Sequence, residues 1–312
     1  MTAPHLRPGA AAPAVALLVN AFVWGVSWWP FRQLAERGLH PLWATVVIYV
    51  LSAFAITAWR PRALRQVATE PALWLIFLAS GTTNATFNWA VSIGDVVRVV
   101  LLFYLMPLWA LLLARVILHE PLTRAAGVRV ALAMAGAALV LWHGEPPDAG
   151  AAATGGLHLP EGLALLGGFA FALNNVMLKR QAARPDEGRA LAMFLGGAAV
   201  AGATAEALSA QAGAGVAWPS GAPGWALPAV GLAFAFMASN LCLQYGAARL
   251  SAAVTAVIMP CEVLFAALTA AWWGAATLHA SVLAGGALIL LATLLSVLEG
   301  GRPARPLPDA AD

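Results

Sequence analysis

Long apolar runs alternate with short polar segments along the whole chain. Ten of these runs are close to 20 residues long, about the length that an α-helix needs to cross the hydrocarbon core of a bilayer. Prolines, glycines and charged residues mark their ends. The pattern predicts ten membrane-spanning helices, at residues 11–31, 41–59, 71–91, 96–118, 125–142, 161–178, 188–208, 225–245, 252–274 and 279–298. The expected fold class is an all-α integral membrane protein.

The composition agrees with this prediction. The chain is 61% hydrophobic and 10% charged, with a mean hydropathy of +0.80, which leaves too little polar surface for a soluble domain. A net charge of +3 does not indicate nucleic acid, because the Lys and Arg residues are scattered between the apolar runs. The partners expected are the lipid bilayer and a small-molecule substrate, with no nucleic acid and no obligate protein partner.

The positions of the basic residues predict the topology. With the N-terminus in the cytoplasm, all but three of the 17 Lys and Arg residues fall in segments on the inner side, and the exceptions are Arg32, Arg37 and Arg98. Such a bias is typical of inner loops. The sequence therefore predicts a multi-pass protein of the bacterial inner membrane with both termini in the cytoplasm.

The two halves of the chain look like copies of each other. Met106-Pro107 in the fourth predicted helix recurs as Met259-Pro260 in the ninth, about 150 residues later. Because each half contains five helices, the second half starts on the opposite side of the membrane, which gives inverted repeats. We predict a first repeat at 1–142, a periplasmic linker at 143–160, a second repeat at 161–298 and a cytoplasmic tail at 299–312.

These features carry a family resemblance. Five plus five helices, the two Met-Pro steps and Glu120-Pro121-Leu122 after the fourth helix resemble the EamA-type branch of the drug/metabolite transporter superfamily. Within it, NWAVSIGDVVRVVLLFYLMPLWALLLARVILHEPL at 88–122 resembles the YddG-type exporters of aromatic amino acids. The second half departs from the first, since Trp272-Trp273-Gly274 stands where Glu120 would recur.

The resemblance implies a secondary transporter that works by alternating access, and not an enzyme. Its implied cargo is aromatic amino acids, together with other amino acids or small organic cations, and no cofactor or metal is expected. An EamA-type exporter of another small metabolite or drug is the alternative. The resemblance and the recurring polar positions predict a central cavity walled by the helices at 11–31, 71–91, 96–118, 161–178, 225–245 and 252–274.

Polar side chains deep inside the predicted spans are the candidates for the substrate site, because such groups are costly in a membrane unless they face protein or water. Glu262 lies near the centre of the ninth helix. It either meets the substrate ammonium or a proton, or it is a hydrogen-bonded carboxyl that locks helices together. Amides can hold both charged ends of an amino acid, or can join helices. The candidate amides are Asn84, Asn88, Asn174, Asn175, Asn240 and Gln244.

Aromatic residues, prolines and one charged pair complete the candidate site. Rings offer stacking and cation–π attraction to a substrate, although plain packing is an equally open interpretation. The candidate rings are those of Trp24, Trp28, Tyr104 and Trp109. Pro107 and Pro260 are expected to kink their helices and to act as hinges, unless they are simply tolerated in the membrane. Asp95 and Arg98 lie one turn apart and are either an outer-gate ion pair or, for Arg98, simply a snorkelling residue.

An enzymatic alternative depends on one motif. His143 and Asp148 have the spacing of an acyltransferase pair, but they fall in the linker, on the side away from cytosolic acyl donors. The sequence shows no metal-ligand cluster, phosphate loop or serine elbow. Cys242 and Cys261 lie inside predicted spans and are interpreted as small buried apolar residues.

Overall fold

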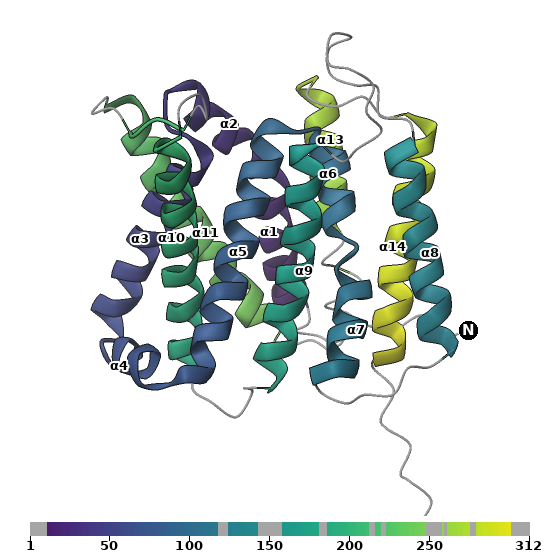
Figure 1. The fold of residues 1–312 in the computed structure, drawn as a ribbon, viewed down its shortest axis with the longest axis horizontal. Helices are drawn as coiled ribbons and strands as arrows, with labels where there is room; N and C mark the ends of the chain where they lie inside the picture. The colour runs from purple at the N-terminus through teal and green to yellow at the C-terminus, as the bar shows by residue number, and fades with distance from the viewer. Residues whose placement is uncertain are drawn as a thin grey trace, which may run out of the picture.

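The computed structural model describes residues 11–117, 124–142, 158–180, 186–211, 216–219, 223–247, 258, 261–274 and 279–300. All regular secondary structure in these residues is helical (Figure 1). Single helices stand at seven of the predicted spans and at the described part of an eighth. They are α3 (Pro41–Trp59), α5 (Pro71–Ile93), α8 (Arg124–Trp142), α9 (Leu159–Arg180), α10 (Asp186–Ser209), α11 (Ala226–Ala247), α13 (Cys261–Trp272) and α14 (Ala280–Gly300).

The first and fourth predicted spans are each divided into two helices. The first consists of α1 (Ala11–Val26) and α2 (Trp28–Glu36), and the fourth of α6 (Val96–Phe103) and α7 (Met106–Ile117). A proline lies just after each break, at Pro30 and Pro107. Because proline has no N–H, the carbonyl four residues earlier loses its helical partner, and the helix is interrupted there. The sequence analysis did not anticipate the break before Pro30.

Two short helices lie outside the predicted spans. The helix α4 (Arg62–Thr69) connects α3 to α5 and buries only Ala63 and Val67, while its basic residues are exposed. A single 3₁₀ turn, η1 (Pro223–Trp225), leads into α11. Alternation between buried apolar and exposed basic positions is typical of a helix that lies along a surface.

Within the described residues, six helical segments are long and apolar enough to cross a membrane. They are Ala12–Glu36, Pro41–Trp59, Val96–Ile117, Leu159–Leu178, Glu187–Ser209 and Ala226–Leu243. The helix α5 is equally long, with 23 residues, but its centre carries several Ser, Thr and Asn residues. Ten residues of α5 from Ala79 to Val91 are buried, several of these polar residues among them, so α5 is an internal helix of the bundle. The chain is therefore a multi-pass membrane protein.

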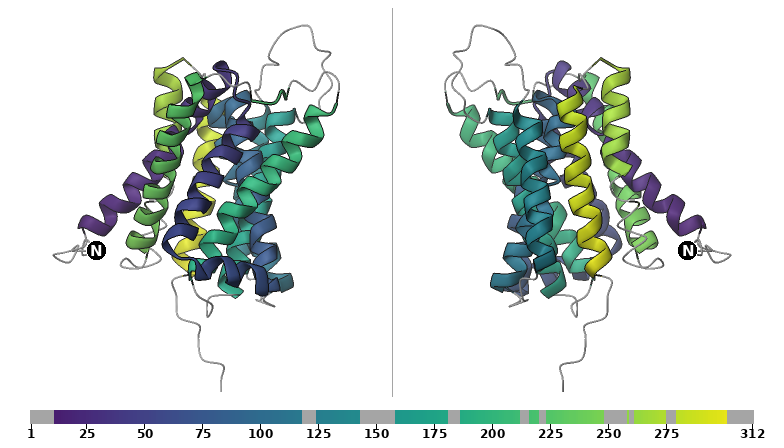
Figure 2. Two further views of the ribbon diagram at one scale, coloured as in Figure 1. Left: turned by 90° about the vertical axis from the view of Figure 1, so that its left-hand side faces the viewer. Right: turned by 90° about the vertical axis from the view of Figure 1, so that its right-hand side faces the viewer.

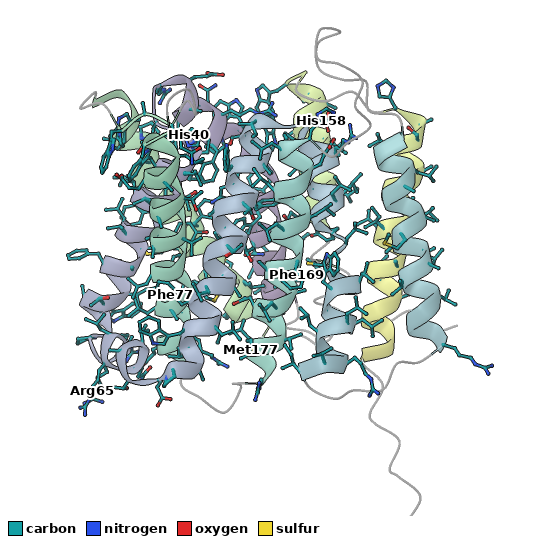
Figure 3. All side chains as sticks on the ribbon, in the orientation of Figure 1. His40, Arg65, Phe77, His158, Phe169 and Met177 are labelled. Carbon is teal, nitrogen blue, oxygen red and sulfur yellow. The ribbon has the colours of Figure 1, made fainter. Side chains whose placement is uncertain are left out.

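The two ends of the bundle differ in charge. The C-terminal end of α3, the helix α4 and the N-terminal ends of α5 and α10 meet at one end, where Arg60, Arg65 and Arg189 lie. We call this the arginine-rich end. Figure 3 shows Arg65 there, and His40 and His158 at the opposite end. The helix α1 crosses the bundle obliquely between the two ends (Figure 2).

Glycines allow the helices to approach closely. A Cβ atom on Gly196 of α10 would lie 2.0 Å from the carbonyl oxygen of Phe77 on α5, and one on Gly136 of α8 would lie 2.6 Å from the carbonyl oxygen of Gly285 on α14. Small residues are the usual contact points between membrane helices, because backbone groups can then pack directly. These contacts fix α5 against α10 and α8 against α14.

Candidate functional site

A cavity of about 560 Å³ lies among α1, α3, α5, α9, α10 and α11. Its described lining consists of Trp24, Tyr49, Ser80, Asn84, Leu178, Arg189, Ala190, Met193, Phe194, Phe236, Asn240 and Leu243. Trp24 and Asn84 come from the middle of their membrane segments, whereas Leu178 and Arg189 come from the arginine-rich end of theirs. The cavity therefore extends from mid-depth toward the arginine-rich end.

Aromatic rings form its deeper wall. The ring centroids of Trp24 and Phe236 lie 4.5 Å apart with an interplanar angle of 51°. Trp24 also meets Phe87 edge-on, at 6.4 Å, on the side of α5. Contacts at these distances are typical of offset and edge-to-face ring pairs. The Trp24 ring is thus held in place from two sides while it lines the cavity.

Amide and hydroxyl groups form a second wall. The Tyr49 hydroxyl donates a hydrogen bond to the side-chain oxygen of Asn84. The Asn84 amide donates to the Ser80 carbonyl oxygen at 2.8 Å. Asn240 from α11 lines the same cavity. Because Tyr49 and Ser80 fix the orientation of the Asn84 amide, this polar wall is organised before any ligand binds.

The arginine-rich end of the cavity carries a charged side chain. Arg189 is the charged side chain among the described lining residues. A smaller pocket of about 280 Å³ adjoins the cavity between α3 and α11 and shares Ala190, Phe194 and Asn240 with it. The smaller pocket contains an ion pair in which Arg60 lies 3.6 Å from Glu187. The walls thus combine rings, amides and one cationic group.

Two further candidates, Tyr104 and Glu262, meet each other outside this lining. The Tyr104 hydroxyl donates to a carboxylate oxygen of Glu262 at 3.1 Å. Tyr104 follows α6 at the break in the fourth span, and Glu262 lies in the first turn of α13. A carboxylate at a helix N-terminus is stabilised by the exposed backbone N–H groups. The α1 backbone passes close by, since a Cβ on Gly25 would lie 2.6 Å from the Glu262 carbonyl oxygen.

The remaining amides are spread through the bundle. Asn88 is fully buried one turn beyond Asn84 and donates to the Thr45 hydroxyl at 3.1 Å. Asn174 is buried on α9, and its neighbour Asn175 is exposed. The side chain of Gln244 lies outside the described residues. Of the six candidate amides, the described lining of the cavity therefore contains Asn84 and Asn240.

Trp28, Trp109 and the prolines also lie apart from the described cavity lining. The indole N–H of Trp28 donates to the Thr269 hydroxyl at 3.1 Å, which joins α2 to α13. Trp109 packs edge-on against Phe169 of α9, with centroids 5.7 Å apart. Pro107 lies in the first turn of α7, and Pro260 is outside the described residues.

Polar contacts join the helices at the end opposite the arginine-rich end. The Arg98 guanidinium forms a salt bridge of 2.9 Å with Glu161 of α9. Asp95 instead caps α6, because its carboxylate accepts the backbone N–H of Arg98 at 2.8 Å. Arg32 donates to the Gly94 carbonyl. Glu161 was not among the candidates from the sequence, because it lies at the edge of a predicted span and looks like an ordinary first-turn acid.

His40 caps α3 at the same end. Its Nδ1 atom accepts the backbone N–H of Leu42 at 3.2 Å, and its ring meets Trp89 edge-on at 5.7 Å. Burial lowers the pKa of the His40 imidazole, since the charged form is poorly solvated there. The ring therefore stays neutral, as an accepting cap requires.

The described walls of the cavity come in part from other helices than the sequence analysis expected. The helices at 96–118 and 252–274 were expected to line it, but the described lining residues come from α3 and α10 in their place. Tyr49, Arg189 and Phe236 were not among the candidates from the sequence. Tyr49 is an isolated phenol within a predicted span, which was the available signal, whereas Arg189 was interpreted only as an inner-side charge.

Comparison with known proteins agrees with this class of membrane protein. Residues 12–142 match the model of the EamA-like transporter family. A crystal structure of a protein 17% identical in sequence has the same fold, with a TM-score of 0.53 over 93% of this chain and 97% of that chain. A search of curated proteins gives no match. The EamA resemblance is thus confirmed for the first half, and the aromatic-exporter subgroup stays a prediction.

The comparisons do not support the acyltransferase alternative. The family matched by residues 12–142 is one of transporters, which points away from catalysis. His143 and Asp148, on which that alternative depends, lie outside the described residues. Within the described residues, no group of three or more His, Cys, Asp or Glu side chains could hold a metal ion.

Proposed function

We propose that this protein is a secondary transporter that exports aromatic amino acids across the bacterial inner membrane by alternating access. The observation that carries the proposal is the cavity itself, in which Trp24 and Phe236 face the same space as Asn84 and Asn240. An aromatic amino acid needs ring-shaped apolar surface and polar partners within one pocket. A volume of about 560 Å³ is within the usual range for small-molecule sites.

Helix contacts support two inverted five-helix repeats. If the two halves are repeats, α1 corresponds to α9, α3 to α10 and α5 to α11. The contact between α1 and α11 then corresponds to the contact between α9 and α5, and both contacts are present. In the same way, the contact between α5 and α10 corresponds to the contact between α11 and α3, and both contacts are present. The helices α8 and α14, the last of each repeat, pack against each other. Inverted repeats are a common basis of alternating access.

The charge pattern predicts which side of the membrane the cavity faces. Basic residues concentrate on the cytoplasmic side of membrane proteins, so the arginine-rich end is expected to face the cytoplasm, with both termini. The cavity extends toward that end. In this state the cavity would exchange substrate with the cytoplasm, which is one of the two states that an exporter needs.

We expect the two walls of the cavity to contribute differently to transport. Trp24→Ala should lower transport of Phe about tenfold more than transport of Thr, because only Phe uses the ring surface. Asn84→Ala should lower both alike, since both amino acids carry the same charged ends. The measurement is uptake of labelled Phe and Thr into proteoliposomes that contain each purified variant.

Trp272→Ala is the matched control, because Trp272 is 88% exposed on α13 and is not part of the described cavity lining. An unchanged ratio of Phe to Thr transport in the Trp24 variant would contradict the aromatic specificity. If the wild-type protein transports an unrelated metabolite but not Phe, the result would favour the alternative, an EamA-type exporter of another small metabolite or drug.

We further propose that Glu262 binds the coupling proton. The carboxylate and Tyr104 join the fourth and ninth spans, and the α1 backbone at Gly25 lies against the backbone of Glu262. A carboxyl in such a place is usually functional. Glu262→Gln keeps the hydrogen bond from Tyr104 but cannot titrate, so transport should lose its dependence on a pH gradient. Wild-type transport by this variant at every value from about pH 5.5 to about pH 8 would make Glu262 structural.

A further inference from the structure

The smaller pocket of about 280 Å³ lies between α3, α10 and α11, and we call it the α3–α11 pocket. Its described apolar lining includes Ala55, Ile56, Trp59, Phe194, Met237 and Leu241. Trp59 and Leu241 are exposed, although both belong to segments that can cross a membrane. The helix α3 also stands at the edge of the bundle (Figure 1). The pocket therefore opens toward the lipid between α3 and α11.

The arginine-rich end of the α3–α11 pocket carries a cationic group that is accessible from outside. The Nε atom of Arg60 lies 3.6 Å from a carboxylate oxygen of Glu187, and both side chains are exposed. A charge-assisted hydrogen bond is shorter, at about 2.8 Å, so an added anion can compete with Glu187 for the guanidinium. The guanidinium also lies over the Trp59 ring, 5.7 Å from the ring centroid. This cation–π contact holds the charge beside the pocket.

More positive charge follows on α4. Arg62 and Arg65 are exposed there, within five residues of Arg60, while Ala63 and Val67 are buried and attach the helix to the bundle. The spanning part of α3 ends at Trp59, so these arginines lie where the lipid headgroups begin. Arginine clusters at the ends of spanning helices attract anionic lipids. The surface beside the α3–α11 pocket is thus suited to a negatively charged headgroup.

We propose that the α3–α11 pocket binds an anionic phospholipid, with the phosphate on Arg60 and an acyl chain against the apolar wall. A guanidinium can hold two phosphate oxygens through parallel N–H groups. The acyl chain reaches the apolar wall directly from the bilayer. Ala190 and Phe194 line both this pocket and the cavity, so the lipid contacts side chains of the cavity wall. The inference goes beyond the proposed function and does not depend on it.

The test compares two phospholipids that differ in net charge and share the same chains. Dioleoyl-phosphatidylglycerol is anionic, and dioleoyl-phosphatidylcholine is zwitterionic. Their binding to the detergent-purified full chain is measured by native mass spectrometry over a range of lipid concentrations. We expect the first bound phosphatidylglycerol to have at least about tenfold higher affinity than phosphatidylcholine, which is the size of one charge-assisted hydrogen bond.

Variants of the ion pair assign this preference to Arg60. Arg60→Gln should abolish most of the difference between the two lipids. Glu187→Gln should instead strengthen binding of phosphatidylglycerol, because it removes the carboxylate that competes with the phosphate. Loss of the ion pair alone would change both variants in the same direction. Arg115→Gln is the matched control, because Arg115 is exposed in the last turn of α7, outside the described lining of the pocket.

A second pair of variants tests the acyl-chain part of the site. Ala55→Phe places a ring in the pocket, so it should weaken binding of both lipids about fivefold and leave their ratio unchanged. Ala58→Phe is the control, because Ala58 is exposed on the same helix and is not part of the described lining.

Two results would overturn the inference. One is equal affinity of the wild-type protein for phosphatidylglycerol and phosphatidylcholine. The other is an unchanged preference in Arg60→Gln, which would place the anionic headgroup elsewhere on the surface. The wild-type comparison decides the question even where a variant fails to fold.

Discussion

In the described residues, the arginine-rich end and the opposite end of the bundle each carry a salt bridge that joins two helices. At the arginine-rich end, Arg60 and Glu187 lie 3.6 Å apart, and their side chains are 58% and 40% exposed. At the opposite end, Arg98 and Glu161 lie 2.9 Å apart, and their side chains are only 18% and 7% exposed. Water and ions compete with the first pair and are largely excluded from the second.

The difference indicates which end can open easily. An exposed ion pair contributes about 0–1 kcal/mol, so the pair at the arginine-rich end adds little to the packing of α3 against α10. Separating a buried pair leaves two poorly solvated charges behind. Further contacts from Trp28 to Thr269 and from Arg32 to Gly94 hold the opposite end together. These contacts therefore close the end opposite the arginine-rich end.

The largest effect is expected from breaking the buried pair. Arg98→Gln or Glu161→Gln leaves one buried charge without its partner, which should destabilise the closed end by about 3 kcal/mol. Thermal unfolding of the detergent-purified variants measures the loss. A cysteine introduced by Trp29→Cys, with Cys242 and Cys261 replaced by serine, should then react faster with a thiol reagent added outside.

The double variant Arg98→Gln with Glu161→Gln is the control for charge. It carries no unpaired charge at this site, so it should be more stable than either single variant. Equal stability of the wild-type protein and both single variants would show that the pair does not close this end.

A much smaller effect is expected at the other salt bridge. Arg60→Gln or Glu187→Gln should change the stability by less than about 1 kcal/mol, and added salt should shrink even that difference. Labelling at position 29 should not change in either variant. Thermal unfolding at low and high salt provides the measurement, and a loss as large as that of Arg98→Gln would remove the contrast between the two ends.

The helix α5 shows how much of the site can be predicted from the sequence. Its polar residues were placed on one helix, and Asn84 and Asn88 on one face of it, from their spacing alone. The packing of α5 gives them different surroundings: Asn84 lines the cavity, and Asn88 meets Thr45. Residues four apart share a face but lie about 6 Å apart along the axis, so a cavity can end between them.

Contacts between distant segments could not be inferred from the sequence. Tyr104 and Glu262 are separated by 158 positions, and each was identified as a candidate without any indication that they meet. Glu161 was missed as the partner of Arg98, because Asp95 lies nearer to it in the sequence. Arg189 looks like any other inner-side charge until α10 packs between α3 and α5.

The sequence by itself determined the helices and their placement in a membrane. A bilayer core offers no water, so every spanning segment must satisfy its backbone groups internally, and length and apolarity are enough to identify such segments. Tertiary structure decided which polar groups face one another. Which polar groups meet depends on how closely the helices approach and at which register, as at Gly81 and Gly196. A sequence pattern with a period of one helical turn does not specify the register between helices.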